Sequence, residues 1–107
     1  MQRVKSQKLF NKTKKMIPGG VNSPVRSFSA VAGSPFIVKK SKGSKIIDID
    51  NNSYIDFIGS WGAMILGHSD ARIIRKLNTV SKSGLTYGAP NRAETEIADF
   101  IIKNIPS

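Results

Sequence analysis

Residues 45–58 read KIIDIDNNSYIDFI, two runs of β-branched and aromatic residues separated by a short polar segment. Runs of this kind, at 45–49 and 54–58, are typical of β-strands. The asparagines between them tolerate positive φ, which a tight hairpin turn requires. Asp48 and Asp50 alternate with isoleucines, as in a strand with one buried face. These residues therefore predict an antiparallel hairpin.

A helical pattern precedes the hairpin. Ser6 is expected to cap this first helix, which ends at Pro18-Gly19-Gly20 and whose apolar face comprises Leu9, Thr13, Met16 and Ile17. A loop rich in proline and glycine follows at 18–35, and a short strand at 36–39 leads into the hairpin.

Two amphipathic helices are expected after the hairpin. The first is capped by Ser69 or Asp70 and stops at Gly84, and the second is capped by Asn91 and ends at Pro106. Their apolar faces comprise Ile73, Ile74, Leu77 and Val80 in the first helix and Ile97, Ala98, Ile101 and Ile105 in the second. The order predicts an α+β segment of helix, loop, small antiparallel sheet and two helices. Because the sheet supplies only part of the surface that these faces need, we expect the edge of a larger body.

Composition excludes several classes of function. The 107 residues include no cysteine and one histidine, which excludes disulfides and a cysteine nucleophile and argues against a protein-only zinc site. The formal net charge is +10, but the lysines are scattered and do not alternate with aromatic residues, so nucleic-acid binding is not favoured. Neither an apolar run long enough to span a bilayer nor a secretory signal is visible, and no membrane partner is expected.

Three side chains are candidates for chemistry. Arg26 lies in a loop stiffened by prolines and presents a planar fork that suits a carboxylate or phosphate, although composition alone favours a solvent-facing connector. Trp61 lies between glycines, where ordinary core packing is the commoner role. His68 could serve as a general base, but no serine or carboxylate partner is identifiable, which favours a packed or capping histidine.

Taken in order, these segments resemble the glutamate-1-semialdehyde 2,1-aminomutases of the class III pyridoxal-phosphate aminotransferase family. The matching motifs are Leu9-Phe10, IPGGVNSPVR at 17–26 followed by Phe28, a D-x-D hairpin ending in Y-I-D at 48–56, GSWG at 59–62, LGH at 66–68 and GL-x-x-GAP at 84–90. The hairpin and LGH are common to class III aminotransferases, whereas VNSPVR together with GSWG is more specific to the aminomutases. The sequence departs from the family pattern at Asn51, Ala71 and Asn91, where Gly, Pro and Thr are usual.

The resemblance implies a fold type I transferase that acts as a homodimer and converts glutamate-1-semialdehyde, (S)-4-amino-5-oxopentanoate, to 5-aminolevulinate in porphyrin biosynthesis. Pyridoxal 5'-phosphate and pyridoxamine 5'-phosphate are the implied cofactor forms, and the cofactor acts as the electron sink. The resemblance also implies that Arg26 holds the substrate carboxylate, that Ser23 lies beside it and that Trp61 lines the pocket. Residues 87–91 are expected near the partner subunit.

By the same resemblance, residues 1–107 form an amino-terminal segment that lacks most of the large cofactor-binding domain, including the Schiff-base lysine. We therefore expect no catalytic residue in this chain, and we expect the chain alone to be inactive. The expected location is the cytoplasm, or the plastid stroma in a plant or alga. Two alternatives stay open: another class III ω-aminotransferase, and an inactive truncated remnant or basic binding module.

Overall fold

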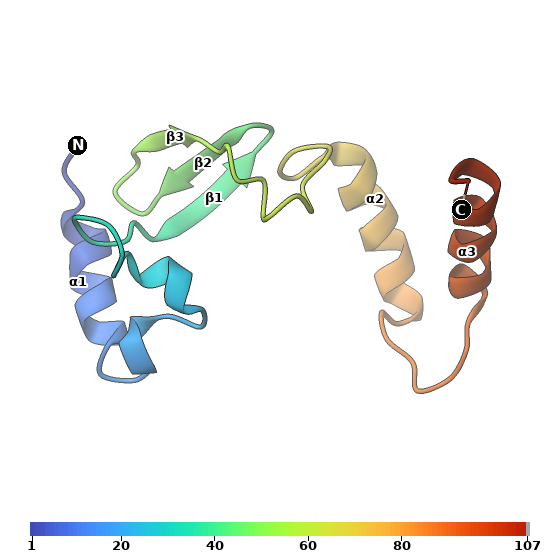
Figure 1. Ribbon diagram of the computed structural model, residues 1–107, viewed down its shortest axis with the longest axis horizontal. Helices are drawn as coiled ribbons and strands as arrows, with labels where there is room; N and C mark the ends of the chain where they lie inside the picture. Colours follow the sequence, from blue (N-terminus) through green and yellow to red (C-terminus); the bar gives the residue numbers. More distant parts are fainter. Residues whose placement is uncertain (107) are drawn as a thin grey trace. The chain divides into compact units, whose positions relative to one another are not determined.

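The computed structural model describes residues 1–106 and divides into two compact units, one formed by Met1–Ala71 and the other beginning at Arg72. Figure 1 shows the elements in chain order. The first unit contains α1 (Val4–Thr13), the short 3-10 helices η1 (Pro18–Gly20) and η2 (Pro24–Ser27), and a sheet of β1 (Val38–Lys42), β2 (Lys45–Asp48) and β3 (Ser53–Ile55). The second contains α2 (Ala71–Val80), η3 (Ser81–Ser83) and α3 (Arg92–Asn104).

The sheet is antiparallel, in the order β1-β2-β3, with Ile46 opposite Ser41 on one side and Tyr54 on the other. The predicted hairpin is confirmed, and Asn51 occupies its turn with φ of 67°. Strand β1 begins two residues later than the sequence predicted, and its pairing with β2 shifts between Val38 and Lys40. The predicted α+β order of elements is therefore confirmed, with small changes at the strand ends.

The buried carboxylate of Asp48 organises the β2–β3 turn. Its Oδ1 accepts hydrogen bonds from the backbone N–H groups of Asp50 (2.9 Å) and Asn52 (2.8 Å). Its Oδ2 accepts from Asn52 Nδ2 (2.9 Å) and from the Tyr54 hydroxyl (2.8 Å). Asp48 has no exposed surface, whereas Ile47 and Ile49 on either side are half-buried. The expectation that the aspartates face solvent is wrong for Asp48, because four donors converge on it and offset the cost of burial.

The same turn caps α1. Asp50 accepts hydrogen bonds from the backbone N–H groups of Lys5 (2.7 Å) and Ser6 (2.8 Å), which have no partner within the helix. A carboxylate at this end also suits the helix dipole. The prediction that Ser6 is the N-cap is wrong: Ser6 is buried inside the helix, and its Oγ accepts from the N–H of Ile37. A cap supplied 44 residues along the chain replaces the local one.

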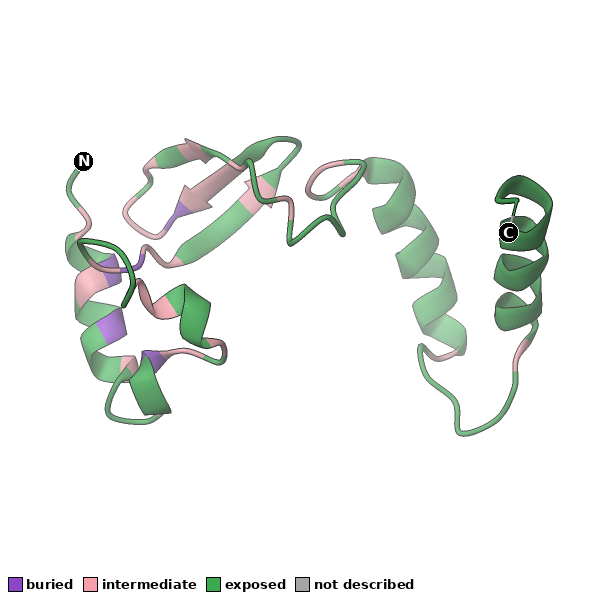
Figure 2. Cartoon of the chain, in the orientation of Figure 1, coloured by how far each residue is buried: buried purple, intermediate pink, exposed green. Residues whose placement is uncertain are grey.

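Aromatic rings connect the loop after α1 to the sheet. Phe28, which follows η2, packs edge-on against Phe36 with ring centroids 6.2 Å apart. Phe36 in turn stacks on Tyr54 of β3 at 4.7 Å. Within residues 1–106, buried positions are few and lie in the first unit, where they include the apolar residues Phe10 and Pro35 (Figure 2). The predicted apolar face of the first helix is wrong: α1 ends at Thr13, before Met16 and Ile17, and Phe10 rather than Leu9 faces inward.

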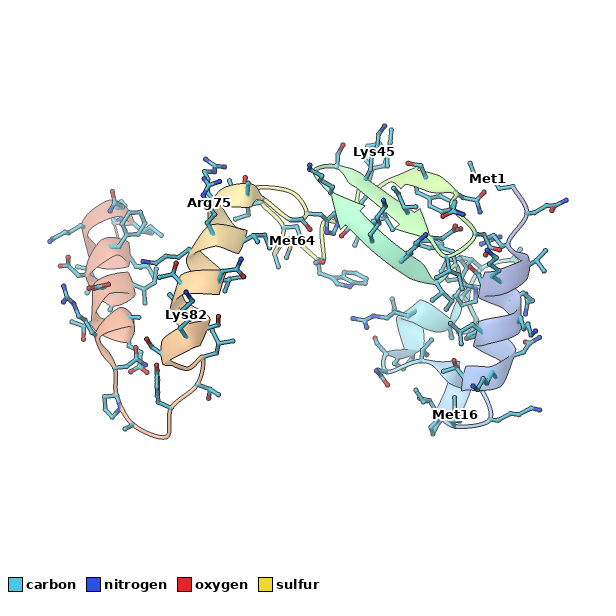
Figure 3. The ribbon with its side chains drawn as sticks, turned by 180° about the vertical axis from the view of Figure 1, so that it is seen from behind. Met1, Met16, Lys45, Met64, Arg75 and Lys82 are labelled. Carbon is cyan, nitrogen blue, oxygen red and sulfur yellow. The ribbon has the colours of Figure 1, made fainter. Side chains whose placement is uncertain are left out.

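A second tie joins the β1–β2 connection to the loop after β3. Gly43 and His68 exchange two backbone hydrogen bonds, each 2.8 Å long. The backbones approach closely because Gly67, with φ of +79°, has no side chain: a Cβ there would lie 2.9 Å from the carbonyl oxygen of Gly43. Figure 3 labels Lys45, at the start of β2, and Met64, in the loop that this tie secures.

In the second unit, the expected cap of the last helix is confirmed. Asn91 caps α3, and its side chain accepts from the N–H of Ala93 (3.0 Å). Glu94 accepts from the Asn91 side-chain amide (2.8 Å). The prediction that the preceding helix extends to Gly84 is wrong: α2 ends at Val80, and Gly84, with φ of 101°, ends the short helix η3 that follows it. The apolar residues of both helices are exposed within the chain, as the sequence predicted for the edge of a larger body. None of the helices in residues 1–106 has the length and apolar character needed to cross a bilayer.

Replacing Asp48 with Asn is expected to lower the melting temperature at neutral pH. The new amide N–H₂ group would face the two donors that now bind Oδ2, so both would lose their acceptor. Burial alone raises the pKa of Asp48, but the hydrogen bonds from Asn52 and Tyr54 outweigh it and hold the pKa below its usual value. The stability from Asp48 is thus fully present above the unfolded-state pKa, about 3.9. It is lost as the pH falls through the lowered folded-state pKa.

Thermal unfolding followed by circular dichroism from pH 7 downward measures this effect. The gap between wild type and Asp48→Asn should narrow as the pH falls below about 4. A gap that stays constant over that range would show that the charge on Asp48 does not stabilise the turn.

Replacing Gly67 with Ala is expected to destabilise the first unit by about 1–3 kcal/mol, because its Cβ would press on the backbone of Gly43 at an unfavourable φ. Gly43→Ala is the matched control, since Gly43 also has positive φ (+56°) but nothing lies within 4 Å of its Cβ position. Urea denaturation should give a larger loss for Gly67→Ala. Equal losses in the two variants would mean that the close approach contributes nothing beyond backbone strain.

Candidate functional site

An open pocket of about 570 Å³ lies in the first unit. Its polar lining consists of Arg26, Ser41, Asp56, Ser60, Trp61 and His68. Its apolar lining comes from the sheet and the loop after β3, through Val38, Ile46 and Ile58. Two of the three residues that the sequence predicted to bind substrate, Arg26 and Trp61, therefore line one pocket although they are 35 residues apart in sequence.

Arg26 is presented by the short helix η2. Its backbone N–H donates to the carbonyl oxygen of Ser23 (3.0 Å), and the Ser27 hydroxyl donates to the carbonyl oxygen of Pro24 (2.7 Å). Phe28 ends the helix with φ of 61° and anchors it to the sheet through Phe36. The Arg26 side chain is exposed. A rigid support and an accessible guanidinium are what recognition of a carboxylate requires.

Ser23, the third predicted residue, occupies the N-cap position of η2, where its backbone carbonyl accepts from Arg26. Ser23 does not belong to the described residues that line this pocket. In this chain it supports the helix that carries Arg26.

Trp61 lies in a turn of unusual backbone conformation. The four residues of the GSWG motif, 59–62, all have positive φ, including Ser60 at 52° and Trp61 at 62°. For residues other than glycine this conformation costs about 1–2 kcal/mol each. The Trp61 side chain is 73% exposed, so core packing is not its role in this unit. Strained backbone that carries an exposed aromatic side chain is typical of a functional site.

Asp56 and His68 form a close pair at the edge of the pocket. His68 Nε2 lies 2.6 Å from Asp56 Oδ2, and the two side chains are 14% and 7% exposed. The hydrogen bond to His68, followed by those from the N–H groups of Ile58 and Gly59, holds the pKa of Asp56 below its usual value. Asp56 is thus ionised at neutral pH. The sequence alone revealed no carboxylate partner for His68. Asp56, which ends the Y-I-D motif, lies 12 residues away along the chain, and no local pattern indicates their pairing.

Other predicted features lie elsewhere. Residues 84–91 belong to the second unit, where the Tyr87 hydroxyl donates to the carbonyl oxygen of Ser83 (2.6 Å). Within the part of the chain that the structure describes, no three acidic or histidine side chains come together as metal ligands would.

Known proteins similar to this chain point to one family. The family model for class-III aminotransferases matches residues 28–106. The glutamate-1-semialdehyde 2,1-aminomutase of Chloroherpeton thalassium is 52% identical over 103 residues, which cover 95% of this chain and 24% of that protein. Glutamate-1-semialdehyde 2,1-aminomutase 2 of Brevibacillus brevis is 49% identical over 107 residues, all of this chain and 25% of that protein. The chain therefore spans about a quarter of the length of these curated relatives.

Solved structures agree in fold. An omega-transaminase from Sphaerobacter thermophilus matches with a TM-score of 0.84 at 26% identity, covering 95% of this chain and 23% of that one. A glutamate-1-semialdehyde aminomutase from Pseudomonas aeruginosa matches with a TM-score of 0.83 at 17% identity, covering 94% and 22%. The resemblance and the fold that the motifs predicted are thus confirmed. The family model, the relatives and the fold agree: this chain belongs to the class-III aminotransferase family.

Proposed function

We propose that this chain is part of a glutamate-1-semialdehyde 2,1-aminomutase and supplies the subsite that binds the carboxylate end of the substrate. The observation that carries the proposal is the shared pocket of Arg26 and Trp61. The names of the similar proteins support the reaction: conversion of glutamate-1-semialdehyde to 5-aminolevulinate.

In this proposal each residue has a distinct task. The guanidinium of Arg26 binds the substrate carboxylate with two parallel hydrogen bonds. The indole of Trp61 forms an apolar wall along the carbon chain and excludes water from it. Ser23 holds η2 through its backbone carbonyl, so that Arg26 keeps its direction. Together these contacts fix the carboxylate end of the substrate. The reacting end is thereby held close to the group that reacts with it.

The cofactor of the proposed enzyme is pyridoxal 5'-phosphate, which also cycles as pyridoxamine 5'-phosphate and supplies the electron sink for amino-group transfer. Similar solved structures carry it, including a transaminase with the pyridoxal form bound and the Pseudomonas aeruginosa aminomutase with the pyridoxamine form. The described residues that line the pocket fit a substrate carboxylate rather than the cofactor, because they include one guanidinium and no lysine amine. We therefore assign no cofactor contact to this chain, and we propose that residues 1–107 alone are inactive.

A class III ω-aminotransferase is the second candidate, since an omega-transaminase is among the structures with the same fold. The proposal also includes a homodimer in which residues 87–91 face the partner subunit. The carboxylate subsite tests the aminomutase proposal, because that proposal requires Arg26 to bind the carboxylate of glutamate-1-semialdehyde.

Replacing Arg26 with Ala in the whole protein is expected to lower kcat/KM for glutamate-1-semialdehyde by roughly 30- to 1,000-fold, which corresponds to about 2–4 kcal/mol. Arg26→Lys keeps the charge but not the planar fork and should give an intermediate loss. Steady-state kinetics measure both.

The control is 2-aminopentanal, which has the same carbon chain without the carboxylate. Its kcat/KM should be low and nearly the same in wild type and Arg26→Ala. Arg26 does not bind the carboxylate if Arg26→Ala lowers kcat/KM equally for both substrates, or if it leaves kcat/KM for glutamate-1-semialdehyde unchanged. Either result would remove the support for the aminomutase proposal.

A further inference from the structure

We propose that the Asp56–His68 pair is a positioning device for Trp61: it holds residues 59–62 in their left-handed conformation and so fixes the indole in the pocket that Arg26 lines. The inference rests on the function proposed above for that pocket. Asp56 and His68 also line that pocket, but we assign them the role of positioning residues, because their side chains bond each other and the backbone before Trp61.

The left-handed turn at residues 59–62 needs contacts from outside the turn to hold it. Ser60 and Trp61 both have left-handed backbone conformation, which side chains disfavour. Within the turn, the N–H groups of Trp61, Gly62 and Ala63 donate to the carbonyl oxygens of Ile58, Gly59 and Ser60 at 3.1, 3.2 and 3.4 Å. These three bonds are longer than the usual 2.9–3.0 Å. The N–H of Met64 closes the turn with a bond of 2.9 Å to the carbonyl oxygen of Gly59, but this bond does not fix the backbone that leads into Ser60 and Trp61. The indole is 73% exposed, so packing of its ring contributes little more.

The carboxylate of Asp56 supplies this support to the turn. Its Oδ1 accepts hydrogen bonds from the backbone N–H groups of Ile58 (2.9 Å), which precedes the left-handed segment, and Gly59 (3.2 Å), its first residue. Both bonds involve a charged acceptor, which makes them stronger than bonds between neutral groups. The direction of the Asp56 carboxylate therefore sets the start of the turn.

His68 in turn fixes this carboxylate. Its Nε2 lies 2.6 Å from the other oxygen, Oδ2. The backbone of His68 is itself held by its two hydrogen bonds with Gly43, and the N–H of Asp56 donates to the carbonyl oxygen of Ser44 at 2.8 Å. Both partners are thus tied to the connection between β1 and β2. A continuous series of contacts runs from the sheet through His68 and Asp56 to Trp61.

Two substitutions of His68 separate the contact with Asp56 from other effects of losing the imidazole. Gln places its side-chain nitrogen near the position of His Nε2, whereas the nitrogen of Asn lies near that of His Nδ1 and cannot reach Asp56 Oδ2. Both amides are polar and uncharged. His68→Asn therefore breaks the contact, and His68→Gln serves as the conservative rescue. Tyr54→Phe is the control, because it removes a hydrogen bond of similar length to a different carboxylate, that of Asp48, on the same sheet.

The experiment follows Trp61 directly in the whole protein with its cofactor. The protein is labelled with 5-fluorotryptophan, and the Trp61 resonance in the ¹⁹F NMR spectrum is assigned by its loss in Trp61→Phe. We expect the resonance to shift and broaden in His68→Asn. In His68→Gln and in the control Tyr54→Phe, we expect it at its wild-type position. We also expect His68→Asn to raise KM for glutamate-1-semialdehyde roughly 10- to 100-fold, with a smaller change in kcat.

An unchanged Trp61 resonance in His68→Asn would overturn the inference, as would an equal shift in Tyr54→Phe, which would indicate general loosening of the unit. The NMR measurement does not depend on the substrate. If Arg26→Ala leaves carboxylate recognition intact, the proposed function fails while the spectrum still decides whether His68 positions Trp61.

Discussion

The carboxylates of the β2–β3 turn join the two ends of the first unit. Asp48 closes the turn by accepting four hydrogen bonds, and Asp50, two residues on, caps α1 from a distance of more than forty residues in sequence. A unit with so small an apolar core gains little from burial alone. Directional bonds to charged acceptors therefore carry much of its organisation. The turn thus fixes the start of α1 against the sheet.

Contacts to the sheet of this unit also fix the position of the site. The ring series from Tyr54 through Phe36 to Phe28 fastens η2, and with it Arg26, to the sheet. On the other side, the tie between Gly43 and His68 secures the loop that carries Trp61. A guanidinium and an indole from segments far apart in sequence thus line one pocket. In the proposed function these residues bind the substrate, and the cofactor supplies the chemistry of amino-group transfer.

Local signals in the sequence predicted much of the fold. Asn51 at the hairpin turn and Asn91 at the start of α3 act through their own backbone neighbours, so their roles could be predicted from a few residues. Ser6 looked like a cap by the same rules, but Asp50 takes that role, and no local pattern could reveal a partner so remote. The motif resemblance identified Arg26 and Trp61 for the pocket. The pairing of Asp56 with His68 depends on how the loop after β3 returns to the sheet, which residue types alone do not specify.

The central claim is that Arg26 and Trp61 together hold the carboxylate end of the substrate. A crystal structure of the whole protein with 5-aminolevulinate bound tests it most directly, because it locates the carboxylate itself. If Arg26 and Trp61 bind the substrate in this way, both carboxylate oxygens will lie about 2.7–2.9 Å from the guanidinium nitrogens of Arg26, with the indole of Trp61 along the carbon chain. A carboxylate bound by other residues, with Arg26 facing solvent, would contradict it.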